Sequence, residues 1–112
     1  DIAGLVGVCI GGALYHIPVV LDGVISMVSA LAAGRLLSGV NDFIIPSHEG
    51  SEPAVALLCE ALSVRPVIRA SLALGEGTGA VMMFALLDMA LSVYKGRTTF
   101  DDISVSQYER YV

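Results

Sequence analysis

The stretch IPVVLDG, residues 17–23, decides the fold of this chain. Its apolar part, residues 17–21, is a short continuous run of the kind found in parallel strands that are covered on both faces. The aspartate and glycine that follow turn the chain, and residues 24–37 then predict a buried helix. Residues 2–15 predict a tightly packed helix before the strand, which Pro18 prevents from continuing. A strand between two helices indicates an α/β unit.

The rest of the chain continues this alternation. Asp1 is placed to cap the first helix, as Ser51 is to cap a later one. The further elements expected are a strand at residues 43–45, a helix from Ser51 to about Leu62, a strand or helix at residues 67–74, and a helix at residues 80–94 closed by Lys95-Gly96. Strands that alternate with helices through short connections predict an α/β fold with a parallel sheet.

The composition is unusually apolar for a chain of 112 residues, with 55% hydrophobic and 15% charged residues. Such a chain has too little polar material to cover itself, so either more protein or a membrane covers part of it. Residues 2–21 contain no charged side chain and are long enough to span a bilayer. Both flanks are acidic, however, and no Lys or Arg lies near to set an orientation. A helix followed by a buried strand explains this run better, and no membrane association is predicted.

Charge and cysteine usage exclude further classes of function. The net charge is −5, and the six Lys and Arg residues form no basic patch, so no nucleic-acid binding is predicted. Cys9 and Cys59 are far apart in sequence and belong to no CxxC motif, which indicates reduced thiols rather than a disulfide or a zinc site. No basic segment precedes the first apolar run, so no signal peptide is expected. These features predict a cytoplasmic protein without a metal or cofactor.

The segment LGEGTGA, residues 74–80, is the most informative for chemistry. Its alternating glycines let the backbone approach a ligand or adopt positive φ. It is a poor phosphate loop, because the glycine spacing is wrong, no Walker lysine follows, and Glu76 would repel a phosphate. A carboxylate presented by glycines suits proton abstraction. The competing interpretation is an ordinary turn in which Glu76 favours the dipole of the next helix.

Polar residues follow each of the other strand candidates. Asp22 ends the first one and suits either sugar hydroxyls or an Asx-type turn. Ser47 and His48 follow the second; for His48 a structural or substrate-contact role is favoured over catalysis. Because ligands of parallel sheets gather beyond the carboxyl ends of the strands, these residues and Glu76 are expected to face one crevice.

Four segments together resemble nicotinate-nucleotide–dimethylbenzimidazole phosphoribosyltransferases, which act in cobalamin lower-ligand synthesis. They are DIAGLVGVCIGGA (residues 1–13), PVVLDG (18–23), IIPSHEGSEP (44–53) and LGEGTGA (74–80). The resemblance covers nearly the whole chain and fades after about Thr98. It implies the C-terminal portion of a parallel-sheet, Rossmann-like three-layer fold over residues 1–98. Residues 99–112 would be a polar tail or part of a small helical subdomain.

The resemblance also implies a reaction and a set of site residues. Glu76 would be the general base that accepts a proton from a benzimidazole base as that base displaces nicotinate from nicotinate mononucleotide. Asp1 and Asp22 would bind substrate, Ser47 and His48 would contact it, and Leu74 and Gly75 would line the base pocket. The family often has a serine where this chain has Gly50, which puts that contact in doubt.

Two further expectations follow from the resemblance. Family members are much longer and carry a glycine-rich phosphate loop outside this segment, so this chain is expected to be inactive alone. They also form homodimers, so a homodimer or association with the missing part of the enzyme would cover the surplus apolar surface. The alternative is a non-catalytic α/β module that binds a small ligand or mediates dimerisation.

Overall fold

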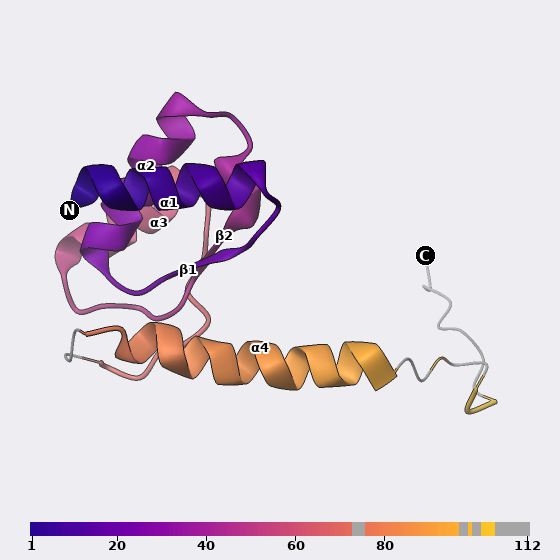
Figure 1. The fold of residues 1–112 in the computed structure, drawn as a ribbon. Coiled ribbons are helices and arrows are strands. Elements are labelled where there is room, and N and C mark those ends of the chain that lie inside the picture. The colour runs from indigo at the N-terminus through magenta and orange to yellow at the C-terminus, as the bar shows by residue number, and fades with distance from the viewer. Residues whose placement is uncertain (73–75, 97–98, 100–101, 105–112) are drawn as a thin grey trace, which may run out of the picture.

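The computed structural model describes residues 1–72, 76–96, 99 and 102–104 (Figure 1). Over these residues helices alternate with short strands, as the apolar runs predict. The elements are α1 (Ile2–Leu14), β1 (Val19–Leu21), α2 (Val24–Leu36), a short 3-10 helix η1 (Val40–Phe43), β2 (Ile44–Pro46), α3 (Pro53–Leu62) and α4 (Thr78–Gly96).

The sheet is parallel, and β1 pairs with β2 in the register Val19↔Ile44 to Leu21↔Pro46. The pairing continues beyond the strands, since the N–H of Ser47 donates to the carbonyl of Leu21 at 3.0 Å. The chain around Ile68 then lies parallel to residues 47–49 through a bridge between His48 and Ile68. The ambiguous stretch at residues 67–74 therefore begins as extended chain, and residues 73–75 lie outside the described part.

Helices lie on both sides of this sheet. In Figure 1, α1, α2 and α3 lie on one side of β1 and β2, and α4 runs along the other. The core lies on the three-helix side, where Ala30 and Ala33 of α2 are fully buried and their small side chains let α1 and α3 approach. The predicted α/β fold with a parallel sheet is thus confirmed.

One predicted helix cap is confirmed in position and the other is wrong. Asp1 occupies the cap position of α1, as predicted, but its side chain makes no capping hydrogen bond; its main-chain carbonyl accepts the N–H of Leu5. The cap position of α3 is Glu52 rather than Ser51, again without a side-chain hydrogen bond. Pro53 does occupy the first turn of α3, where its missing N–H costs nothing. Helix α2 begins differently, because the Ser26 hydroxyl donates to the Gly23 carbonyl and accepts the Gly23 N–H.

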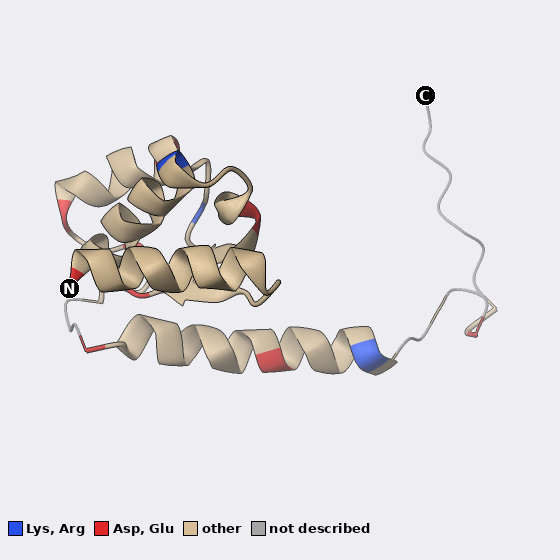
Figure 2. Cartoon of the chain, turned by 45° about the horizontal axis from the view of Figure 1, so that its top comes forward, with Lys and Arg blue, Asp and Glu red and all other residues tan. Residues whose placement is uncertain are grey.

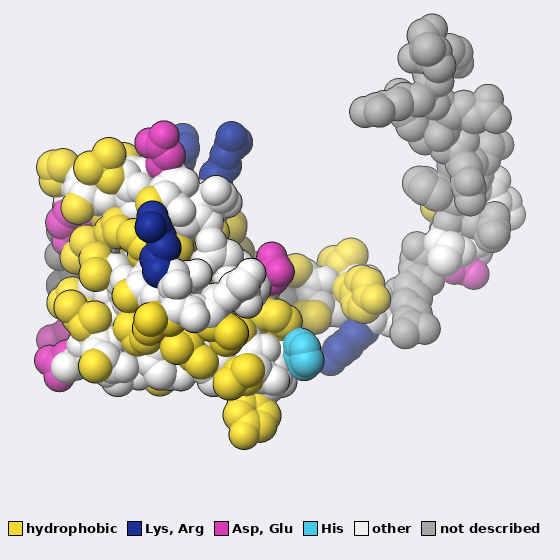
Figure 3. All heavy atoms as spheres, turned by 90° about the horizontal axis from the view of Figure 1, so that it is seen from above, with side chains coloured by type: hydrophobic (Ala, Val, Ile, Leu, Met, Phe, Trp, Pro, Cys, Tyr) yellow, Lys and Arg dark blue, Asp and Glu magenta, His cyan; other side chains and the backbone are white. Residues whose placement is uncertain are grey.

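Much apolar surface stays exposed, as the composition predicts. Figure 3 shows hydrophobic side chains over much of the face that α1 and α2 present. Helix α4 is the extreme case: only Gly79 and Met83 are buried. The large apolar side chains exposed on α4 are Val81, Met82, Phe84, Leu86, Met89, Leu91, Val93 and Tyr94. Charged side chains are few on α4 (Figure 2), so this helix requires cover.

The run at residues 2–21 is a helix followed by a strand, as predicted, because α1 ends at Leu14 and β1 begins at Val19. Within the described ranges, one helix is long and apolar enough to cross a membrane by length and composition, and it is α4. Asp88 interrupts the uncharged run of this helix, and the helix continues through it, as the predicted helix at residues 80–94 does. One such helix is weak evidence for a membrane span.

Candidate functional site

Asp22 joins the sheet to the start of α4. It follows β1 directly, and both of its carboxylate oxygens face the first turn of that helix. The N–H of Gly77 donates to Oδ2 at 3.1 Å, and the N–H of Ala80 donates to Oδ1 at 3.0 Å. The first N–H groups of a helix have no partner within it, and a carboxylate there is also stabilised by the positive end of the helix dipole. The Asp22 carboxylate therefore caps α4 from another element rather than forming a local turn.

Glu76 lies one residue before this capped turn. Its φ is +64°, in the left-handed region, and Gly77 follows at +81°. Glycine adopts that conformation freely, whereas a glutamate there is strained. Residues held in such conformations cluster at functional sites. Asp22, and not Glu76, supplies the hydrogen-bonding cap of α4, and the competing interpretation of Glu76 as a turn residue that favours the helix dipole stays open. The Glu76 side chain is exposed at the mouth of the turn.

His48 lies beneath the same turn. It is buried, and its Nδ1 lies 3.0 Å from the Ser47 hydroxyl, which is also buried. Gly79 packs directly on the ring: a Cβ at that position would lie 2.7 Å from Cε1 and 2.8 Å from Cγ of His48. Contacts this short do not occur in proteins, so α4 can begin here only because residue 79 has no side chain. The last glycine of LGEGTGA thus serves close packing, and Gly77 serves the positive φ.

One cavity brings the two carboxylates together. Its volume is about 400 Å³, and Asp22, Glu76 and Gly77 line one part of it. The other lining residues come from α1 and from the start of α2; they are Leu5, Gly23, Val24, Ile25 and Ser26. The start of α4 and the N-terminal end of α1 lie on the same side of the molecule in both ribbon views (Figures 1 and 2). An exposed carboxylate beside aliphatic walls suits a flat apolar ligand that carries a proton to lose.

The structure unites some of the predicted site residues and separates others. Asp22 and Glu76 share the cavity, as expected. Ser47 and His48 do not line it, so the expectation of a single crevice fails for this pair. Asp1 caps nothing with its side chain and is not among the lining residues either. Its substrate-binding role, like those of Ser47 and His48, stays a prediction. The predicted pocket residues Leu74 and Gly75 lie outside the described residues.

Sequence reasoning missed the aliphatic wall of this cavity. Leu5 is one of many apolar residues in the first helix, and nothing in the sequence distinguishes it. Val24 and Ile25 carried a weak signal, because they follow the LDG turn at the carboxyl end of β1, where ligands of parallel sheets bind.

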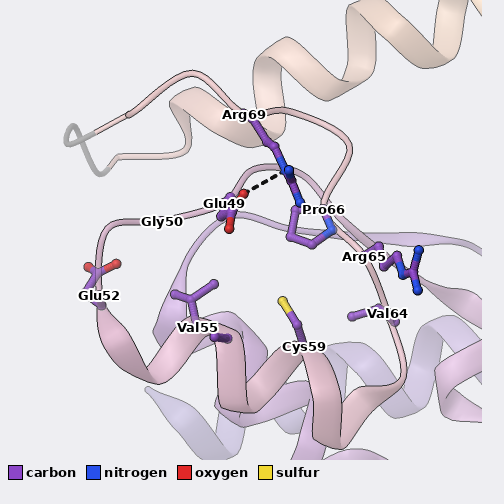
Figure 4. Close-up of a pocket in the computed structure, with 10 residues that line it drawn as sticks. Glu49, Gly50, Glu52, Val55, Cys59, Val64, Arg65, Pro66 and Arg69 are labelled. Carbon is purple, nitrogen blue, oxygen red and sulfur yellow. Dashed lines mark ion pairs between the residues drawn. The ribbon is translucent and has the colours of Figure 1, made fainter.

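A second cavity, of about 280 Å³, lies between α3 and the chain that leads to Ile68 (Figure 4). Glu49 and Arg69 form an exposed ion pair of 2.9 Å beside it. An exposed pair of this kind contributes little to stability, because solvent screens it. Cys59 faces this cavity from α3, and none of the predicted site residues that the structure describes lines it.

The Cys59 thiol is expected to react slowly at neutral pH. Burial and, secondarily, the negative charge of Glu49 raise its pKa, so little of the nucleophilic thiolate is present. The rate of its alkylation by iodoacetamide should therefore rise with pH, and the rise should occur at a higher pH than for an exposed free cysteine. A Glu49→Gln chain should react faster at the same pH, which mass spectrometry of the modified peptide would measure. Equal rates in the two chains would contradict the electrostatic part of this account. Cys9, which is buried in the core, should react only after unfolding.

Comparison with known proteins gives one family. A phosphoribosyltransferase family model matches residues 1–105. A curated relative from Acetivibrio thermocellus is 45% identical over 112 residues, which is 100% of this chain and 32% of the relative. A relative from Chlorobium chlorochromatii is 41% identical over 107 residues, covering 96% of this chain and 30% of its own length. Both are named nicotinate-nucleotide–dimethylbenzimidazole phosphoribosyltransferase.

A solved structure agrees. The crystal structure of a nicotinate-nucleotide–dimethylbenzimidazole phosphoribosyltransferase from Thermus thermophilus superposes with a TM-score of 0.86 at 34% sequence identity. It covers 96% of this chain, which in turn covers 32% of that protein. The chain thus spans about a third of the length of the relatives it matches.

Proposed function

The chain belongs to the nicotinate-nucleotide–dimethylbenzimidazole phosphoribosyltransferase family, and we propose that it supplies the proton-accepting side of phosphoribosyl transfer in the complete enzyme. The substrates would be nicotinate mononucleotide and 5,6-dimethylbenzimidazole, with α-ribazole 5′-phosphate and nicotinate as products, a step of cobalamin lower-ligand synthesis. The observation that carries this proposal is the placement of Glu76 on a capped, left-handed turn at the edge of a cavity with aliphatic walls.

The proposed step needs one base. One ring nitrogen of the benzimidazole attacks the anomeric carbon of nicotinate mononucleotide and forms the new carbon–nitrogen bond. The bond to nicotinate breaks, and nicotinate leaves with its electron pair. Positive charge develops on the attacking ring, so the proton on its other nitrogen becomes acidic. Glu76 accepts that proton, which neutralises the ring as the bond forms. The reaction is balanced with this one base, and it involves no change of oxidation state.

The cavity supports this reaction on the side of the base. Leu5, Val24 and Ile25 offer aliphatic surface against which an aromatic ring packs. A volume of about 400 Å³ exceeds what a two-ring base occupies, which leaves space for part of the sugar. Apolar walls also exclude water, which would otherwise compete for the electrophilic sugar carbon.

The proposal extends to what covers α4 and to where the protein is found. The exposed apolar side chains of α4 would be covered either by the part of the enzyme that this chain lacks or by a second copy in a homodimer. A cytoplasmic location, without membrane association, fits reduced cysteines and substrates of this kind.

The decisive experiment compares this chain alone with a chimera in which it replaces the matching third of the Acetivibrio thermocellus relative. Both are incubated with nicotinate mononucleotide and dimethylbenzimidazole, and α-ribazole phosphate is separated by chromatography. We expect product only from the chimera, because the chain alone covers a third of the relatives. A folded chimera without product would contradict the assigned reaction. The alternative, a non-catalytic ligand-binding or dimerisation module, would then be the better account.

A further inference from the structure

We propose that Asp22 is a positioning residue for Glu76, and that it acts by holding the first turn of α4 rather than by contacting substrate. This inference rests on the proposed function of Glu76. It differs from the substrate-binding role expected for Asp22 from the family resemblance.

The hydrogen bonds of Asp22 carry the inference. Its two oxygens accept from Gly77 and Ala80, which lie 55 and 58 residues later in the chain. The carbonyl of Gly77 accepts the N–H of Val81 at 3.0 Å, so Gly77 stands where the cap residue of α4 stands. Gly77 has no side chain with which to cap, and Ala80 has none that could reach back as in a capping box. Asp22, immediately after β1, thus provides the acceptors that the side chains of Gly77 and Ala80 cannot.

The position of Glu76 makes this cap matter for chemistry. Glu76 immediately precedes Gly77 and is held at a φ of +64°. Strain of this kind persists only where the surroundings fix the backbone, and uncapped helix ends fray. The bonds from Gly77 and Ala80 to a residue anchored at the end of β1 fix that backbone. Without them the turn is free to relax, and the Glu76 carboxylate moves relative to the cavity.

A double-mutant cycle in the chimera tests this role. Asp22→Ala is expected to lower kcat by about 10- to 100-fold, the cost of a misplaced catalytic group. The KM values for both substrates should stay within about twofold, because the contacts that bind the substrates in the ground state are unaffected. Asp22→Asn should recover part of the loss, since its amide oxygen still accepts one N–H. In a Glu76→Gln background, Asp22→Ala should cost less than about threefold, because the group it positions no longer acts. Asp42→Ala, at an exposed position of η1 away from α4 and from the cavity, is the matched control and should change none of these values.

Additive losses would overturn the inference, because they would mean that Asp22 acts independently of Glu76. So would a rise of tenfold or more in the KM for nicotinate mononucleotide, which would indicate direct substrate binding.

Amide hydrogen exchange provides a readout that does not depend on activity. In this 112-residue chain, Asp22→Ala should accelerate exchange at Gly77 and Ala80 by at least about tenfold, as expected when a cap hydrogen bond is lost. The amide of Ala30, in the middle of α2 and fully buried, should be unchanged. Unaltered exchange at Gly77 and Ala80 would overturn the positioning role even in an active enzyme. A wild-type chimera without activity would instead overturn the proposed function of Glu76, and the positioning role with it.

Discussion

Glu76→Gln is expected to lower kcat for phosphoribosyl transfer in the chimera by about 10²- to 10⁴-fold, the usual contribution of a general base. Glutamine has the same shape and fits the same left-handed turn, so the fold and the cavity should persist. It cannot accept the benzimidazole proton, which must then leave to water. Rates measured under saturating substrate would give kcat, and the KM values should change much less, because the lost interaction develops only in the transition state.

The matched control is Glu60→Gln, which removes an exposed carboxylate on α3 that does not line the site cavity. It should leave turnover within about twofold, since a substitution on the surface and away from the site usually has a small effect. Normal turnover by the Glu76→Gln enzyme would contradict the assigned role. It would favour a module in which this glutamate only shapes the turn before α4.

Gly79→Ala is expected to destabilise the chain by about 1–3 kcal/mol, the cost of overpacking a close contact. Helix propensity alone would give the opposite sign, because alanine is favoured over glycine inside a helix by about 1 kcal/mol. The contact with His48 decides the outcome, since the new methyl group would overlap the imidazole ring. That ring is buried and hydrogen-bonded to Ser47, so moving it away would itself cost stability. Urea unfolding followed by far-ultraviolet circular dichroism would measure the change.

Two variants make this prediction specific. Gly7→Ala lies in α1, where a Cβ meets nothing within 4 Å, so it should be neutral or stabilising. The double variant Gly79→Ala with His48→Ala should be less destabilised than the sum of the single changes, because the overlap is gone. If Gly79→Ala were as stable as Gly7→Ala, the close packing of α4 on His48 would not exist in solution. In the chimera, Gly79→Ala should also reduce turnover, since it displaces the turn that carries Glu76.

The elements of this fold follow from local patterns in the sequence. The run before the LDG turn forms β1, and the glycine-rich segment leads into α4, whose end at Lys95-Gly96 matches its local signals. Helix caps were less predictable. Asp1 stands at the cap position of α1 without a side-chain hydrogen bond, and α3 begins one residue later than a Ser51 cap requires. Capping depends on side-chain direction and on the residue at which the helix begins, which neighbouring residues alone do not fix.

By itself, the sequence determined the alternation of strands and helices and the carboxylate within a glycine-rich turn, because periodicity, turn residues and backbone freedom act over a few neighbouring positions. Only the tertiary structure decided that Asp22 caps α4, that Gly79 must be a glycine because His48 lies against it, and that Leu5 forms a wall beside Glu76. These relations join residues that are distant along the chain. They arise where β1 and β2 deliver their carboxyl ends to the same edge of the sheet, and no local pattern encodes that meeting.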